Sequence, residues 1–200
     1  MLVDVLIVLG GYLVGSLPFG VLLVRLLRGE DIRAVGSGNI GATNVWRVYG
    51  RKLGLPVALL DVAKGCGPAL VGLLVSGAWV GVLAGIGAMI GHARPVYLRF
   101  AKGGKMVATA GGVAFALAPL AALACLILWI AVFAVLRYSS VASMLASIAL
   151  PLLCWAFGAE WPVVGFGGIA CLGVLVLHRP NIQRLLHGTE PRFSRKERIA

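Results

Sequence analysis

Acidic residues are scarce in this chain, which holds 7 Asp and Glu against 18 Lys and Arg, and only 12% of its 200 residues are charged. In a typical soluble domain about a quarter of the residues are charged. Hydrophobic residues make up 60% of the chain, and the mean hydropathy is +0.98. This shortage of charge excludes an ordinary soluble domain and indicates a single polytopic membrane domain.

Cysteine and histidine are also few. The 4 cysteines all lie within apolar stretches without a CxxC spacing, which predicts buried thiols rather than disulfides or a metal site. The 3 histidines are scattered and have few carboxylates to join them, so we expect no metal and no cofactor. No basic residue precedes the first apolar run, which is too long for a signal-peptide core, so we expect it to stay as a helix.

Seven apolar segments predict an all-α fold with seven transmembrane helices. A spanning helix needs about 17–25 residues. The third and fourth segments are shorter, so we expect them to be tilted, to lie where the bilayer is thinned, or to be broken helices. The segments cover residues 3–27, 53–76, 78–92, 106–118, 120–136, 141–158 and 161–178, and a basic tail follows at 179–200.

The basic residues predict the orientation of these spans. Every Lys and Arg except Lys64 falls in or beside four regions, which are 25–52, 94–105, Arg137 and 179–198. Seven spans place all four regions on one side of the membrane, and the positive-inside rule makes that side cytoplasmic. The N-terminus is then outside and the C-terminus inside. The basic face would attract anionic lipid, and no soluble module is present to bind nucleic acid.

Four polar clusters interrupt the apolar pattern, and the first is the loop "GSGNIGATN" at 36–44, with Arg47 beyond it. Its glycines let backbone N–H groups turn towards an anion, while its Ser, Thr and Asn side chains add donors. A short helix that begins after Thr43 or Asn44 would add a partial positive charge. The loop matches neither common nucleotide motif. A phosphate site and a structural turn are both compatible with it.

Two further clusters lie in the later basic regions. Lys102 and Lys105 flank a pair of glycines, Gly103 and Gly104, which would let a ligand approach the backbone closely. The positive-inside rule alone explains the lysines but not the glycines. At the end of the last span, "HRPNIQR" begins at His178, and its proline should stop the helix. His178 and Asn181 would then lie at the membrane surface.

The fourth cluster is a charge pair within the second span. Asp61 and Lys64 are three residues apart, so they share one helical face and are expected to form an intramembrane ion pair. Near the sixth span, Ser139, Ser140 and Ser143 follow a basic turn. Serine is a favoured N-cap residue, so we expect at least one of these three to cap the helix.

Several segments together resemble the bacterial acyl-phosphate:glycerol-3-phosphate acyltransferases, the PlsY family. They are "GSGNIGATNVWRVYG", "LDVAKG", "GHARPVYLRFAKGGKMVAT", "RYSSVAS" and "HRPNIQRLLHGTE". The resemblance implies a seven-span enzyme of the bacterial inner membrane with a cytoplasmic active site. Such an enzyme moves a fatty acyl group from acyl phosphate to the 1-hydroxyl of glycerol 3-phosphate, in the first acylation of phospholipid synthesis. No obligatory protein partner is evident beside these substrates and the surrounding lipid.

The resemblance also implies roles for individual residues. The donor phosphate would be bound by the first loop, chiefly through Ser37, Asn39 and Thr43. The catalytic candidates are His178, Ser37 and Lys105. The substrate-binding candidates are Gly36, Gly38, Asn39, Gly41, Thr43, Asn44, Arg47, Gly103, Gly104, Ser143 and Asn181. Of these, Arg47 and Asn181, with Lys105, His178 and Ser143, are assigned to glycerol 3-phosphate.

No acyl-enzyme is expected, because no Cys or Ser–His–Asp set stands on the cytoplasmic side. Acyl transfer would be direct, with either His178 or the donor's own phosphate oxygen taking the proton. Few carboxylates are available to orient a charged His178, which favours the phosphate oxygen.

The chain departs from the family pattern at three positions, and two other functions are also compatible with its sequence. Ala101 is inserted after the phenylalanine of the second loop, Met106 replaces a glycine, and Arg94 replaces an aromatic residue. A phosphate transporter would use the short spans as broken helices. A non-catalytic subunit would bind anionic lipid and would tolerate loss of Arg47 or Lys105 as well as loss of Arg195.

Overall fold

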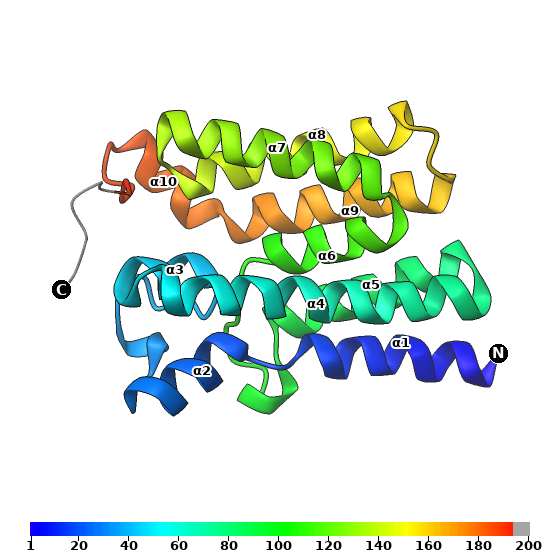
Figure 1. The fold of residues 1–200 in the computed structure, drawn as a ribbon, viewed down its shortest axis with the longest axis horizontal. Coiled ribbons are helices and arrows are strands. Elements are labelled where there is room, and N and C mark those ends of the chain that lie inside the picture. The colour runs from blue at the N-terminus through cyan, green and yellow to red at the C-terminus, as the bar shows by residue number, and fades with distance from the viewer. Residues whose placement is uncertain (194–200) are drawn as a thin grey trace.

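The computed structural model describes residues 1–193; residues 194–200, the end of the predicted basic tail with Arg195, lie outside the described residues. The described chain is folded almost entirely into helices joined by short loops (Figure 1). The α-helices are α1 (Leu2–Gly15), α2 (Phe19–Arg28), α3 (Ala42–Tyr49), α4 (Arg51–Ser76), α5 (Ala78–Ala93), α6 (Val107–Leu117), α7 (Pro119–Leu136), α8 (Ser139–Ala156), α9 (Trp161–Leu177) and α10 (Arg179–Leu186), and two 3-10 turns, η1 (Ile32–Ala34) and η2 (Val96–Leu98), lie in the loops.

The predicted all-helical membrane class is confirmed. Four segments are long and apolar enough to cross a membrane, namely Leu2–Arg28, α4, α7 and α8, and the bent pair α9–α10 makes a fifth candidate. Helix α5 has 16 residues and α6 has 11, so both are shorter than the roughly 20 residues that a straight span needs. The count of seven spans and the orientation of the termini therefore stay predictions.

The first span is not the unbroken helix that we predicted over residues 3–27. Helix α1 ends at Gly15 and α2 begins at Phe19, so residues 16–18 interrupt the helix. Pro18 has no N–H for a helical hydrogen bond, and its ring crowds the preceding turn, which explains the break. The interruption exposes backbone carbonyls within the apolar region, and these need partners from elsewhere in the protein.

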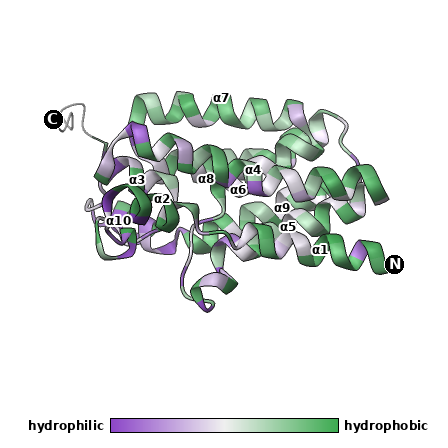
Figure 2. Ribbon diagram, turned by 60° about the horizontal axis from the view of Figure 1, so that its bottom comes forward, coloured by the Kyte–Doolittle hydropathy of each residue, from purple (hydrophilic) through white to green (hydrophobic). Residues whose placement is uncertain are grey.

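The helices form two groups that meet at α6. Helices α1, α4 and α5 pack against one another on one side, while α7, α8 and α9 pack on the other (Figure 1). Helices α2, α3 and α10 gather at the end opposite the N-terminus (Figure 1). Most of the hydrophilic ribbon lies at this same end, and the long helices are mainly hydrophobic (Figure 2). The polar chemistry is therefore concentrated at one end of the bundle.

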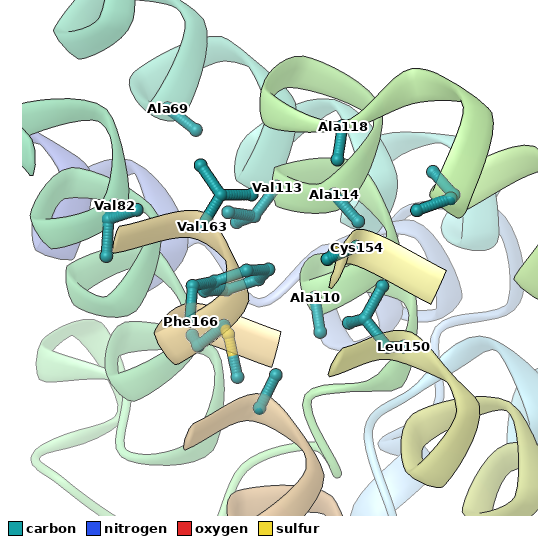
Figure 3. Close-up of a cluster of buried hydrophobic side chains, with 14 of the residues drawn as sticks. Ala69, Val82, Ala110, Val113, Ala114, Ala118, Leu150, Cys154, Val163 and Phe166 are labelled. Carbon is teal, nitrogen blue, oxygen red and sulfur yellow. The ribbon is translucent and has the colours of Figure 1, made fainter. Parts of the chain in front are cut away.

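Small side chains hold the two groups close together. The core cluster is rich in alanine and is filled by a few larger residues such as Phe166, Val113 and Leu150 (Figure 3). A Cβ atom on Gly65 of α4 would overlap the carbonyl oxygen of Thr109 on α6, so only glycine allows these backbones to cross. Without a hydrophobic driving force in lipid, such close backbone packing is what stabilises helix pairs.

The predicted serine cap of α8 is wrong. The N-cap residue is Tyr138, and no side chain caps the helix. Ser143 instead donates from its hydroxyl to the carbonyl oxygen of Ser139 at 2.7 Å, within the first turn. The hydroxyl of Ser140 points away from the helix axis to the C-terminal segment, where it donates to Glu190 at 2.7 Å. Ser140 thus makes a tertiary contact and Ser143 a contact within its own helix, and neither caps α8.

Candidate active site

The side chain of Asn44 organises the first predicted loop. Helix α3 begins at Ala42, earlier than we predicted, and Asn44 therefore lies in its first turn with only 2% of its surface exposed. Its Oδ1 accepts the N–H of Ser37 at 2.9 Å, and its Nδ2 donates to the carbonyl oxygens of Val35 and Asn39 at 3.1 and 3.0 Å. The side-chain amide of Asn44 is therefore hydrogen-bonded within the loop itself, and we revise Asn44 from a substrate ligand to a residue that supports the loop.

Two glycines of this loop have backbone conformations that favour glycine. Gly36 and Gly38 have φ values of 60° and 68°. A Cβ atom on Gly36 would also overlap Oδ1 of Asn44. These positions therefore allow the tight turn that lets Asn44 reach across the loop.

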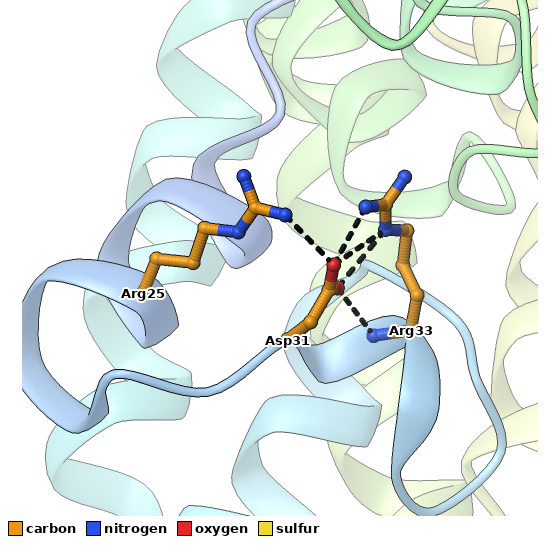
Figure 4. Close-up of polar contacts among 3 residues, drawn as sticks. All are labelled: Arg25, Asp31 and Arg33. Atoms are coloured by element: carbon orange, nitrogen blue, oxygen red, sulfur yellow. Dashed lines mark hydrogen bonds and ion pairs between the residues drawn. The ribbon is translucent and has the colours of Figure 1, made fainter.

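An ion cluster fixes the approach to the loop. Asp31 accepts from Nη2 of Arg25 at 3.0 Å and from Nη2 of Arg33 at 2.6 Å, and it also accepts the backbone N–H of Arg33 at 3.0 Å (Figure 4). The hydrogen bonds from Arg33 hold the pKa of Asp31 far below its ordinary value. The cluster thus ties α2 to η1 just before the glycine-rich turn.

The second loop is fastened to the end of α5. Gly103 donates its N–H to the carbonyl oxygen of Ala93, and Gly104 donates to that of His92, both at 3.0 Å. A Cβ atom on Gly104 would overlap the His92 ring. Both glycine N–H groups are therefore used within the protein, and Gly104 also allows close packing on the His92 ring.

The first and second loops also contact each other. Asn39 donates from Nδ2 to the carbonyl oxygen of Gly103 at 3.3 Å, while its Oδ1 accepts the N–H of Gly41 at 2.9 Å. Residues 64 positions apart in the chain are thus joined directly. Gly41 contributes its N–H to this arrangement, so it supports Asn39.

The third segment reaches the same place from α10. The chain bends by 56° between α9 and α10, with Pro180 in the first turn of α10. Asn181, which is 5% exposed, accepts a hydrogen bond at its Oδ1 from Nζ of Lys105 at 2.6 Å. The bend therefore points a side chain of the last segment at the second loop.

Glu190 holds this end of the protein together. Its Oε1 accepts from Ser140 and from Nδ2 of Asn181, both at 2.7 Å, and its Oε2 accepts from Nε of Arg184 at 2.7 Å. Burial alone would raise the pKa of Glu190, but these three hydrogen bonds lower it below its ordinary value. One ionised carboxylate therefore links α8, α10 and the following turn.

A cleft of about 60 Å³ opens where the three segments meet. Its lining is mostly polar and basic and comes from the first loop, the second loop and α10. The lining residues are Ser37, Gly38, Asn39, Lys102, Lys105, Leu177, Pro180, Asn181 and Arg184.

The field in this cleft is positive. Burial lowers the pKa of Lys105 to about 8; Glu190 opposes this shift, while the charges of Arg184, Lys102 and Arg47 favour it. The guanidinium of Arg47 also lies 4.8 Å from the centroid of the Phe193 ring, a cation–π contact. A cluster of cations with one nearby carboxylate is suited to bind a phosphate.

His178 occupies the junction of α9 and α10 and is 3% exposed. Its Nδ1 lies 2.8 Å from the carbonyl oxygen of Val174. Since a carbonyl can only accept, Nδ1 carries the proton, and Nε2 is left as the acceptor nitrogen. The fields of Lys105 and Glu190 reach this ring, which places it beside the basic cluster.

The intramembrane charges meet in the middle of α4. Nζ of Lys64 lies 2.8 Å from Oδ1 of Asp61, and both side chains are almost fully buried. Lys64 also donates to the carbonyl oxygen of Leu17 at 2.8 Å, inside the break between α1 and α2. Nδ1 of His92 lies 3.7 Å from the same Asp61 oxygen. The pair thus supplies a partner for the interrupted first span.

Comparison with known proteins identifies the family. A family profile described as glycerol-3-phosphate acyltransferase matches residues 5–188. The glycerol-3-phosphate acyltransferase of Synechococcus sp. (strain JA-3-3Ab) is 45% identical over 188 residues, covering 94% of this chain and 92% of the relative. The chain belongs to the glycerol-3-phosphate acyltransferase family. The enzyme of Thermosynechococcus vestitus (strain NIES-2133 / IAM M-273 / BP-1) is 48% identical over 199 residues, covering 94% of each chain.

Solved structures agree with this assignment. The crystal structure of PlsY, an integral membrane glycerol 3-phosphate acyltransferase, in its glycerol 3-phosphate form has a TM-score of 0.91, 41% identity and 96% coverage of each chain. Its lysophosphatidic acid form has a TM-score of 0.89, 39% identity and coverage of 96% of this chain and 95% of that one. Membership in this acyltransferase family decides against the transporter and the non-catalytic subunit as readings of the chain.

The predicted site residues of the acyltransferase divide into three groups. Ser37, Asn39, Lys105 and Asn181 meet at the cleft, with Gly38 beside them. A second group supports the loops from behind the cleft, and it consists of Gly36, Gly41, Asn44, Gly103 and Gly104. A third group, which is not part of the cleft lining, consists of Thr43, Arg47, Ser143 and His178.

Ser143 differs most from its predicted place. Besides donating to Ser139, its hydroxyl accepts a hydrogen bond from Nε1 of Trp129 at 3.0 Å. Ser140, one of the other two serines, is the one that joins the network below the cleft. The sequence offered no signal for this difference, because all three serines stand in the first turn and a half of one helix.

Sequence reasoning missed the roles of Glu190 and His92. Glu190 accepts three side-chain hydrogen bonds, and His92 lies between Asp61 and the second loop. A signal existed for Glu190, since it is one of only 7 acidic residues in a strongly basic chain. Such a residue in a basic segment is expected to be paired.

The departures from the family pattern lie in distinct local settings, and nothing in the structure explains the arginine at position 94. Met106 has a left-handed backbone, with φ of 67°, at the N-cap of α6, which is a conformation that a glycine adopts without strain. Arg99 and Phe100, just before the inserted Ala101, also have positive φ values of 53° and 59°. The carbonyl oxygen of Arg94 accepts from the hydroxyl of Tyr12 at 2.9 Å. The inserted residue is thus absorbed in an exposed turn before the lysine–glycine segment.

Proposed function

We propose that this acyltransferase moves a fatty acyl group from acyl phosphate to the 1-hydroxyl of glycerol 3-phosphate and releases lysophosphatidic acid and phosphate. The observation that carries the proposal is the cleft between the two loops and α10, where Lys105 donates to Asn181 at 2.6 Å. Both substrates carry phosphate, and a basic cleft at the polar end of an apolar bundle suits them. The acyl chain would lie among the apolar helices.

The acceptor phosphate is assigned to Lys105, Asn181 and Arg47, whereas the predicted contact from Ser143 is not proposed again because its hydroxyl donates to Ser139. Lys105 provides a compact ammonium, and Arg47 provides a planar donor group for phosphate oxygens. The charge of Arg47 acts on Lys105, which supports a shared site. The phosphate of glycerol 3-phosphate would compete with Oδ1 of Asn181 for the Lys105 ammonium. The negative phosphate would then be paired with a positive charge.

The donor phosphate is assigned to the first loop. Ser37 and Asn39 line the cleft, and Thr43 stands in the first turn of α3. The first N–H groups of a helix have no partner within it and carry a partial positive charge, so the start of α3 supports an anion there. Ser37, assigned a catalytic role, would also donate to the developing oxyanion at the acyl carbonyl.

The acyl transfer is direct. The 1-hydroxyl oxygen attacks the acyl carbon, the bond from that carbon to the phosphate oxygen breaks, and phosphate leaves. We assign the hydroxyl proton to a phosphate oxygen of the donor, and His178 orients the acceptor without taking that proton. Val174 holds the ring through a neutral carbonyl, and no carboxylate is hydrogen-bonded to the described ring atoms. A neutral carbonyl stabilises a charged imidazolium less than a carboxylate does.

The topology is proposed as seven spans with the N-terminus outside and the site on the cytoplasmic side of the bacterial inner membrane. Helices α2, α3 and α10 lie at one end (Figure 2), and Lys102 and Lys105 line the same cleft as residues of the first loop and α10. This clustering supports a single basic face, as the positive-inside rule requires.

The test is an assay of the purified protein in detergent. Phosphate release from acyl phosphate should depend on glycerol 3-phosphate, whereas acyl-CoA should not replace the donor. Lys105→Ala should raise KM for glycerol 3-phosphate, whereas Arg28→Ala, on the exposed end of α2, should leave it unchanged. Equal turnover with acyl-CoA would contradict the assigned donor. In the same assay, near-normal kcat for His178→Gln would support the phosphate oxygen as proton acceptor.

A further inference from the structure

His92 lies between the intramembrane ion pair and the loop that carries Lys105. It lies in the last turn of α5, is 3% exposed and does not line the cleft. One edge of its ring faces Asp61, with Nδ1 at 3.7 Å from Oδ1. The other edge lies so close to Gly104 that a Cβ atom there would overlap Nε2, Cε1 and Cδ2. The ring is thus held between a buried carboxylate and the backbone of the second loop.

The backbone of the same residue also fastens the loop. The carbonyl oxygen of His92 accepts the N–H of Gly104, and that of its neighbour Ala93 accepts the N–H of Gly103. Lys105 is the next residue along the chain, and its ammonium reaches Asn181. The position of Lys105 therefore depends on two hydrogen bonds and one ring contact at the end of α5.

We infer that His92 is a positioning residue for Lys105, which it holds in place by packing its ring on Gly104, with the Asp61 carboxylate 3.7 Å from the opposite edge of the ring. Asp61 is itself fixed by Lys64, which also holds the break in the first span at Leu17. A continuous set of contacts therefore runs from the middle of the bundle to the cleft. The inference rests on the proposed role of Lys105 as a ligand of the acceptor phosphate.

A shift of Lys105 should weaken the binding of glycerol 3-phosphate more than the chemistry. Small misplacements of a positioned group have large effects, and we expect His92→Ala to raise KM for glycerol 3-phosphate about tenfold. KM for acyl phosphate should change little. Gly104→Ala, which pushes on the ring from the loop side, should give the same pattern.

Substitution at His92 also tests the contact with Asp61. Leu keeps bulk beside Gly104 without a polar atom, so His92→Leu should retain more affinity for glycerol 3-phosphate than His92→Ala but less than the wild type. Asn places an amide near the position of Nδ1 but lacks the ring atoms that contact Gly104, so His92→Asn should resemble His92→Ala. If His92→Leu binds glycerol 3-phosphate as tightly as the wild type does, the contact between Asp61 and His92 has no part in positioning Lys105.

The decisive measurement is a double-mutant cycle with Lys105→Ala. If His92 acts through Lys105, His92→Ala should add no further increase in KM for glycerol 3-phosphate in the Lys105→Ala background. Met89→Ala serves as the control, because Met89 is equally buried one turn earlier on α5, in the core cluster. It should lower Tm without changing KM.

The outcomes separate this inference from the site itself. An additive effect of His92→Ala in the Lys105→Ala background would overturn the positioning role and leave the phosphate site intact. A KM that Lys105→Ala leaves unchanged would overturn the phosphate site and the inference with it. A rise in KM for Met89→Ala equal to that for His92→Ala would reduce His92 to a core residue.

Discussion

Lys105 and Asn181 are 76 residues apart in the chain, and their side chains are joined by a hydrogen bond of 2.6 Å. The bond connects the loop before α6 with the first turn of α10. Asn181 uses its other amide atom to donate to Glu190 at 2.7 Å. A single amide therefore sets the distance between an ammonium and a carboxylate that would otherwise approach each other.

Asn181→Ala should lower kcat/KM for glycerol 3-phosphate by about 100-fold, mainly through KM. The change removes a substrate ligand, takes the Asn181 partner from the Lys105 ammonium and removes one of the three hydrogen bonds to Glu190, and loss of a partner costs about 1–3 kcal/mol for a buried group. Steady-state kinetics at saturating acyl phosphate gives the measurement. Gln183→Ala is the matched control, because Gln183 is exposed on the same helix. A comparable loss in that control would show that α10 is disturbed as a whole.

Binding of glycerol 3-phosphate should weaken as pH rises through about 8. Burial lowers the pKa of Lys105 to about 8, so its ammonium is the main form below this pH and the neutral amine above it. The substrate phosphate is already dianionic in this range, since its second pKa is near 6. KM should therefore increase about tenfold for each pH unit well above 8, while kcat changes less.

Lys105→Arg provides the control for this pH dependence. Arginine stays protonated at all accessible pH values, so the increase in KM above pH 8 should disappear even if the absolute affinity is lower. Isothermal titration calorimetry of the wild type near pH 8.5 should also detect proton uptake on binding, because a bound phosphate raises the pKa of Lys105. An unchanged pH profile in Lys105→Arg would assign the titration to another group.

Glu190→Gln should destabilise the protein by about 1–3 kcal/mol. The carboxylate accepts three side-chain hydrogen bonds, whereas an amide must turn an N–H group towards one of these donors. The pKa of Glu190 is lowered in the folded protein, so its contribution is present above the ordinary value near 4.5 and is lost as pH falls through the folded value. Thermal unfolding from pH 3 to 7 should show this loss of stability at low pH in the wild type, and a smaller loss in Glu190→Gln. Parallel curves for the two proteins would contradict the assignment.

The sequence predicted the helical class, most helix bounds and the meeting of three distant segments. Apolar length and the distribution of Lys and Arg are strong signals in membrane proteins, because lipid penalises polar backbone and charge. Ser37, Lys105 and Asn181 were found by residue type within polar loops. The spacing of Asp61 and Lys64 likewise predicted a contact that the structure places at 2.8 Å.

The division of labour among the polar residues could not be predicted from the sequence. Asn39 and Asn44 are five residues apart in one loop, yet Asn39 lines the cleft while Asn44 is buried beneath it. Gly103 and Gly104 suggested a backbone that a ligand can approach closely, and the sequence did not show that their N–H groups donate to α5. Such differences depend on which carbonyl lies nearby in the fold, and local sequence does not contain that information.

The buried pair of Asp61 and Lys64 should be cooperative in stability. Replacing either residue alone with Leu leaves the other charge without compensation at membrane depth, which costs roughly 3–5 kcal/mol. Asp61→Leu also leaves His92 without the carboxylate at 3.7 Å, and Lys64→Leu leaves the Leu17 carbonyl without its side-chain donor.

The double variant of Asp61 and Lys64 should lose clearly less stability than the sum of the two single changes, because it removes both charges together. Some loss should persist, since no side chain then donates to the carbonyl of Leu17 in the break of the first span. Thermal unfolding in detergent, followed by circular dichroism, measures all four proteins of the cycle. Strict additivity would mean that the two charges do not stabilise each other, and Lys64 would then act only through Leu17.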